Sequence, residues 1–205
     1  MQRRDLLKLI ATATGTMMVG GQALAYDLVQ PVPLSDTGFS KDEVALLNEM
    51  GEVILPKTDT PGAKEANVGA TMAVLVADCY TPVLQKTFKR GLLDINKRCK
   101  EAYGNDFLLL SAEQRTALFN TLDTEAKAAN LAKGLSANLE MSRPNHWEPG
   151  DAAPAPHYFT LLKQLTLYCF FTSKVGATKV LRYVAIPGYY DGDFPYKKGD
   201  KAWAT

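Results

Sequence analysis

The chain has 205 residues, of which 46% are hydrophobic and 22% are charged, so its composition is that of an ordinary globular domain rather than a disordered or fibrous protein. The formal net charge of +1 excludes a nucleic-acid-binding protein whose affinity comes from bulk positive charge. Two histidines and three cysteines leave little material for a metal cluster or a disulfide scaffold.

The beginning of the chain resembles an export signal. Five residues match the twin-arginine signal of bacteria in type and order: Arg3, Arg4, Leu6, Leu7 and Lys8. The uncharged run that follows is shorter and more polar than a membrane-spanning helix, and Ala23 and Ala25 are placed as signal peptidase requires. We therefore expect residues 1–25 to be a cleaved twin-arginine signal peptide and residues 26–205 to form one mature domain. A retained N-terminal anchor is the alternative.

The first half of the mature chain carries clear helix starts. Residues 26–38 contain prolines and a glycine and are expected to be extended. Ser40 followed by Glu43 predicts a capping box and a helix that continues until Pro56. A loop to about residue 66 precedes a second helix, and Thr81 before Pro82 predicts the start of a third.

The second half contains two more predicted helices. Ser111 followed by Gln114 predicts another capping box and a helix whose apolar face includes Leu118, Leu122, Ala126 and Ala129. Residues 134–156 are expected to be irregular because they contain four prolines. Residues 158–171 are apolar on nearly every side, which predicts a helix at the centre of the fold. Together these patterns predict an all-α domain, a small bundle of about five helices with long loops and an extended C-terminal tail.

The chain lacks the motifs of a self-sufficient enzyme. It has no glycine-rich phosphate-binding turn, no haem c attachment motif and no serine-hydrolase or zinc-protease motif. We therefore expect no catalytic residue, no cofactor-binding residue and no metal ligand in this chain. The alternative is a catalytic role for His146 or His157 as a base. Asp191 and Asp193 are interpreted as turn residues, because the remaining ligands of a calcium loop are missing.

The three cysteines leave two interpretations open. Cys79 and Cys99 lie on apolar stripes of consecutive predicted helices, and Cys169 lies in the most apolar helix. Buried free thiols are the usual state of such cysteines. Because the number of cysteines is odd, the alternative is one pair within the chain or a bridge to another chain.

Aromatic side chains are concentrated in the tail. Residues 183–205 contain six aromatic residues together with three glycines and two prolines, so this segment is not expected to be helical. Tyrosine and tryptophan are enriched at protein interfaces. Five residues are therefore candidates for a partner interface: Tyr189, Tyr190, Phe194, Tyr196 and Trp203. The alternative is that these rings fill grooves between the helices of their own domain.

Three stretches give the mature chain a resemblance to a known family. They are residues 54–68 (ILPKTDTPGAKEANV), residues 159–177 and residues 181–203. In this order, and behind a twin-arginine signal, they are similar to the small subunit of gluconate 2-dehydrogenase, called subunit 3. The resemblance implies a non-catalytic subunit that accompanies a large FAD-dependent dehydrogenase of the glucose-methanol-choline type.

The resemblance also implies partners and a location. A cytochrome c subunit with haem c commonly takes the electrons, and the small subunit supports maturation of the large one and its export by the twin-arginine translocase. The complex is then periplasmic and membrane-associated through its other subunits. Related subunits serve dehydrogenases of glucose, sorbitol, fructose and glucosides, including glucoside 3-dehydrogenase. A free-standing exported binding or scaffold protein is the alternative function.

Overall fold

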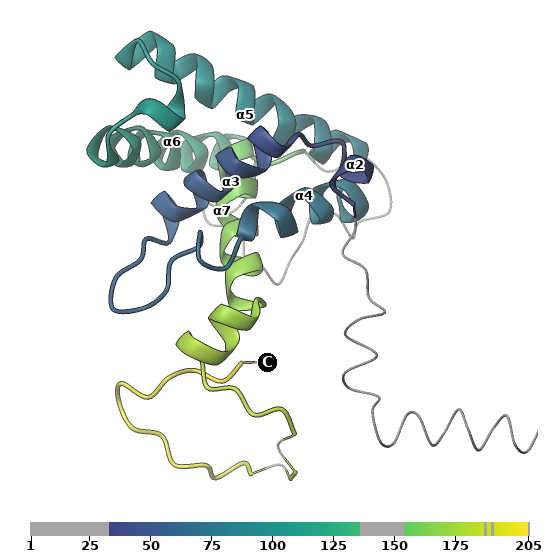
Figure 1. Cartoon of the computed structure of the whole chain (residues 1–205), viewed down its shortest axis with the longest axis vertical. Helices are drawn as coiled ribbons and strands as arrows, with labels where there is room; N and C mark the ends of the chain where they lie inside the picture. Colours follow the sequence, from purple (N-terminus) through teal and green to yellow (C-terminus); the bar gives the residue numbers. More distant parts are fainter. Residues whose placement is uncertain (1–32, 136–153, 187, 190, 205) are drawn as a thin grey trace, which may run out of the picture. The chain divides into compact units, whose positions relative to one another are not determined.

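The computed structural model describes residues 33–135, 154–186, 188–189 and 191–204. The predicted signal residues, His146 and Tyr190 lie outside them. Five helices of twelve residues or more make up the domain: α3 (Lys41–Ile54), α4 (Val68–Cys79), α5 (Pro82–Tyr103), α6 (Ala112–Ala132) and α7 (Tyr158–Phe171). The described residues contain no β-strand. The predicted all-α bundle of about five helices is therefore confirmed (Figure 1).

The helix starts that depend on neighbouring residues lie where the sequence predicts them. At α3, the Ser40 hydroxyl accepts a hydrogen bond from the Glu43 backbone, and the Glu43 carboxylate accepts one from the Ser40 backbone. Ser111 and Gln114 form the same capping box at α6. Thr81 caps α5, whose first residue is proline. Each cap satisfies backbone donors that a helix start leaves free.

The start of α4 is set by another helix. Asn67 precedes α4 in the left-handed conformation, with φ of 49°, and its side chain does not cap the helix. Instead, Asn48 of α3 accepts a hydrogen bond from the Gly69 backbone at 2.8 Å and donates one to the Asn67 side chain at 2.9 Å. Gly69 permits this close approach, because a Cβ atom there would lie 2.4 Å from the carbonyl oxygen of Val44.

The segment before α3 differs from the prediction. Residues 26–38 were expected to be extended, but Leu34–Thr37 form one helical turn, α2, which packs against α4. Thr37 is buried and donates its hydroxyl to the Leu34 carbonyl at 2.8 Å. Phe39 is also buried, with its ring edge-on to that of Phe88 at 6.4 Å. Burial of Phe39 against α5 brings the preceding residues onto the bundle, and a compact turn satisfies their backbone.

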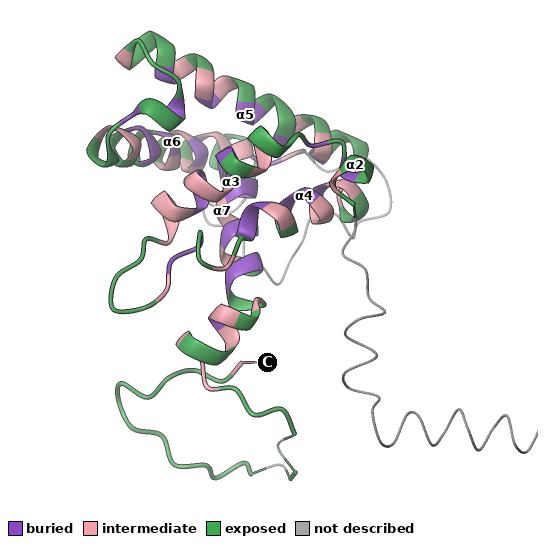
Figure 2. Cartoon of the chain, in the orientation of Figure 1, coloured by how far each residue is buried: buried purple, intermediate pink, exposed green. Residues whose placement is uncertain are grey.

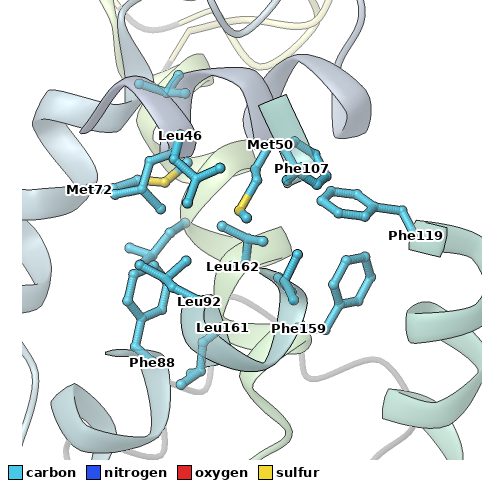
Figure 3. Packing of buried hydrophobic residues seen from close by; sticks show 14 of the residues in the cluster. Leu46, Met50, Met72, Phe88, Leu92, Phe107, Phe119, Phe159, Leu161 and Leu162 are labelled. Carbon is cyan, nitrogen blue, oxygen red and sulfur yellow. The ribbon is translucent and has the colours of Figure 1, made fainter. Parts of the chain in front are cut away.

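Helix α7 occupies the centre of the bundle, as predicted. It packs against α3, α4, α5 and α6. In Figure 3 the labelled side chains of these helices point into the same space around Leu162, which is almost completely buried. In the last turn of α7, Cys169 and Phe170 still belong to the core, whereas Tyr168 and Phe171 are exposed. Figure 2 shows that exposed residues predominate along the tail that follows. A further turn, η3 (Gly176–Val180), follows and leads into the tail.

Candidate partner-binding surface

The tail is a closed loop. Arg182 donates its backbone N–H to the Ala202 carbonyl at 2.8 Å, and Ala204 donates to the Arg182 carbonyl at 2.9 Å. These bonds form a single parallel bridge between Arg182 and Trp203. Residues 183–202, which we call the tail loop, therefore begin and end at the same point (Figure 1). Such closure costs entropy, so contacts at the base of the loop must stabilise it.

The Arg182 side chain provides those contacts. The central carbon of its guanidinium group lies 4.7 Å from the ring centroid of Trp203 and 5.3 Å from that of Phe194. The two rings meet edge-to-face, with centroids 5.4 Å apart. A guanidinium nitrogen also lies 3.7 Å from a carboxylate oxygen of Asp200. A cation held over two rings and beside a carboxylate is a favourable arrangement at a partly exposed site.

The large apolar side chains between the two ends of the tail loop face solvent. Ile186, Tyr189 and Tyr196 expose 83%, 79% and 78% of their surface. The described rings therefore do not fill grooves between the helices, because Phe194 and Trp203 pack on Arg182 and on each other. Three of the five candidate interface residues, Tyr189, Phe194 and Tyr196, thus lie in the exposed tail loop, and Trp203 lies at its base. Tyr190 lies outside the described residues.

Part of the exposed apolar surface has no signal in the sequence. Tyr168 and Phe171 in the last turn of α7 and Tyr183 and Val184 at the start of the tail loop are also exposed. For Tyr168 and Phe171 the reason is that a helix that is apolar on every side gives no signal of which side is buried. Exposed apolar residues therefore continue along the chain from α7 into the tail loop, which is typical of a protein interface rather than of a free surface.

The loop between α3 and α4, residues 55–67, braces the base of the tail. The Glu52 carboxylate holds this loop by accepting hydrogen bonds from the backbones of Lys57 and Lys64, both at 2.8 Å. Glu65 then forms ion pairs with Lys57 at 3.8 Å and with Lys179 at 2.8 Å. The hydrogen bond from Lys179 is the main reason that the pKa of Glu65 is lowered. These contacts link the α3–α4 loop to the turn that leads into the tail loop.

His157 has the contacts of a helix cap. Its backbone N–H donates to the buried Asn130 side chain at 2.9 Å, and its ring nitrogen accepts from the Phe159 backbone at 3.3 Å. Burial lowers the pKa of His157, so the ring is neutral at pH 7 and can accept that bond. The neighbouring Tyr158 donates its hydroxyl to Asp94 at 2.6 Å. These contacts fix the start of α7 against α5 and α6.

The other polar candidates form no cluster. Asp193 donates its backbone N–H to the Asp191 carboxylate at 3.0 Å, so the two residues form a turn, as interpreted from the sequence. Among the residues that the structure describes, no group of three or more histidine, cysteine, aspartate or glutamate side chains is placed to hold a metal ion. No helix in that part of the chain is both long and apolar enough to span a bilayer.

The cysteines are free thiols, and one of them is not buried. Cys99 and Cys169 are buried, as expected, but Cys79 is exposed. Cys79 is the last residue of α4, and the inward position at this helix end is taken by Tyr80, whose ring meets that of Phe88 edge-on at 6.5 Å. The expectation of burial was therefore wrong for Cys79, because the apolar stripe ends one turn before the helix does.

Thiol labelling should distinguish these cysteines. Burial raises the pKa of Cys169 to about 12 and also raises that of Cys99, so neither is a thiolate at pH 8. We expect a maleimide-type reagent to modify Cys79 alone in the folded protein and all three thiols in denaturant, as counted by intact mass. A C79S variant should remain unmodified under the native conditions. Equal labelling of the three thiols in the folded protein would contradict this assignment.

Comparison with known proteins gives one match. A family model described as gluconate 2-dehydrogenase subunit 3 matches residues 41–188. This range begins at α3, includes every long helix and ends within the tail loop. Comparison with curated proteins and with solved structures gave no match.

Proposed function

Since the chain belongs to the gluconate 2-dehydrogenase subunit 3 family and is therefore of the type of a dehydrogenase-complex subunit, we propose that it is the non-catalytic small subunit of a periplasmic complex that oxidises a sugar or a sugar acid. Gluconate 2-dehydrogenase and glucoside 3-dehydrogenase are examples of such activities on CH–OH groups. The large partner subunit carries FAD and is of the glucose-methanol-choline type. A cytochrome c subunit, with haem c, passes the electrons towards the membrane.

In this proposal the chain has two tasks. It binds the folded large subunit in the cytoplasm and supports its maturation. Residues 1–25 then direct both proteins to the twin-arginine translocase, which accepts folded cargo, so the large subunit needs no signal of its own. The observation that carries the proposal is the family match over residues 41–188. The exposed aromatic side chains of the tail loop support it, because they offer a surface for a partner.

Co-purification tests the proposal. The chain is tagged at its C-terminus in its native host and purified from solubilised membranes. We expect a second, larger polypeptide to elute with it, together with the absorption spectrum of FAD and sugar-oxidising activity with an artificial electron acceptor. Peptide mass identifies the partner as a flavoprotein.

Two results would contradict the proposal. If the chain elutes alone and no flavin accompanies it, a free-standing exported scaffold is favoured instead. If the chain purified without the larger polypeptide binds flavin and oxidises sugar by itself, it is an enzyme and not an accessory subunit.

A further inference from the structure

The three stretches that distinguish this chain meet at one end of the domain. Residues 54–68 contain the α3–α4 loop, and residues 181–203 contain the tail loop. Residues 159–177 contain most of α7, whose last turn carries the exposed Tyr168 and Phe171. Lys179, which lies between the second and third stretches, links the first to the third: it pairs with Glu65 at 2.8 Å, and its carbonyl accepts a hydrogen bond from Lys201 at 2.8 Å. The base of the tail loop is therefore attached to the α3–α4 loop through Lys179.

The C-terminal segment also differs in net charge from the rest of the mature chain. Residues 172–205 contain six lysines and arginines and three aspartates, whereas residues 26–171 contain 14 basic and 18 acidic residues. The end that carries the exposed rings is thus basic, and the rest of the domain is acidic. Lys197 and Lys198 are exposed, and neither ammonium group forms an ion pair with another described residue. Their charges are available to a partner.

The tail loop is also held in shape before any partner binds. Its ends are joined at Arg182, the Arg182 guanidinium fixes Phe194 and Trp203, and Asp200 accepts a hydrogen bond from the Lys197 backbone at 2.9 Å. Ordering a free segment of this length on binding would cost conformational entropy at every residue. A loop that is already closed avoids much of this cost, which favours binding.

We propose that the tail loop is the docking element for the large FAD-dependent subunit, and that it inserts Tyr189 and Tyr196 into an apolar depression whose rim carries carboxylates facing Lys197 and Lys198. Arg182 is the positioning residue that keeps the loop closed. This inference rests on the proposed function, because the large subunit is the partner it names.

A protein partner explains the charges better than a lipid surface does. Aromatic and basic side chains together also suit anionic membranes. However, Asp191 and Asp193 are exposed and lie between Tyr189 and Phe194 in the chain, where an anionic lipid surface would repel them. A protein surface can place opposite charges against each of these groups separately.

The test uses the flavoprotein identified in the purified complex, separated from the full chain and then rebound to it. We expect K197E/K198E to weaken binding on the order of tenfold and to reduce its dependence on salt. We expect Y189A/Y196A to weaken binding on the order of 30-fold, because exposed tyrosines are frequent hot spots. Two matched controls lie on other elements, K86E/R90E on α5 and L93A/L131A on α5 and α6, and should bind as the wild type does.

Arg182 is tested without the partner as well as with it. In a W147F background Trp203 is the only tryptophan, so its emission reports on the base of the loop. R182A should change the Trp203 emission spectrum in the isolated chain and weaken flavoprotein binding on the order of tenfold, while the helical circular dichroism stays unchanged. R182K retains a cation over the rings and should restore part of both.

The outcomes separate this inference from the proposed function. Wild-type affinity of both loop variants for the flavoprotein would overturn the docking assignment and leave the proposed function standing. Binding to phosphatidylglycerol vesicles that K197E/K198E abolishes, with unchanged flavoprotein affinity, would assign the loop to the membrane and overturn the inference. Absence of any flavoprotein from the purified complex would overturn both.

Discussion

Replacing Arg3 and Arg4 together by lysine is expected to leave the large dehydrogenase subunit folded, loaded with FAD and trapped in the cytoplasm. The twin-arginine pathway distinguishes the arginine pair from lysines, although the charge of the signal is the same. The large subunit crosses only as a passenger under the proposed function, so its export fails together with that of the small subunit. The measurement is sugar-oxidising activity in the periplasmic and cytoplasmic fractions, which should shift almost entirely to the cytoplasm.

A matched control isolates the effect of position. R90K makes the same exchange on the exposed surface of α5, and the complex should be exported normally. Normal periplasmic activity in the R3K/R4K variant would show that the complex is not exported in this way. Loss of activity from both fractions would instead mean that the change prevents maturation, which the proposal does not predict.

The substitution Gly69→Val should strongly destabilise the bundle. A Cβ atom at this position would lie 2.4 Å from the Val44 carbonyl oxygen, which belongs to the backbone of α3 and cannot rotate away. Helices α3 and α4 must then separate, and the hydrogen bond from the Gly69 backbone to Asn48 is lost. We expect the free energy of unfolding to fall by roughly 3 kcal/mol, measured by urea denaturation followed by circular dichroism.

Thr71→Val provides the comparison for this substitution. Thr71 lies in the same helix and is exposed, and its replacement by valine keeps the branching at Cβ. Its effect on the free energy of unfolding should lie within about 0.5 kcal/mol. If Gly69→Val were as stable as Thr71→Val, the close approach of α3 and α4 at this point would not contribute to the fold.

The candidate site was only partly predictable. The aromatic content of the tail identified Tyr189, Phe194, Tyr196 and Trp203, because these residue types are enriched at interfaces wherever they occur. Nothing in the sequence showed that Arg182 would close the loop, since the rings that it contacts lie 12 and 21 residues further along the chain. The ion pair between Glu65 and Lys179 joins residues that are 114 positions apart and was equally hidden.

Short-range patterns predict the five long helices and the starts of α3, α5 and α6. Ser40 with Glu43 and Ser111 with Gln114 are three residues apart, so their capping interactions form wherever that short segment becomes helical. The apolar composition of residues 158–171 likewise predicts that α7 is central, because a helix that is hydrophobic on every side is stable only when most of it is buried.

Features that depend on contacts between distant residues follow only from the folded arrangement of the chain. Asn48 holds the start of α4, and Arg182 closes the tail loop. Cys79 and Tyr168 are exposed. Each of these outcomes depends on which segments lie against one another after the chain has folded. Periodicity within a single segment is a local property, and it is the same whether a given face ends up against the core or in solvent.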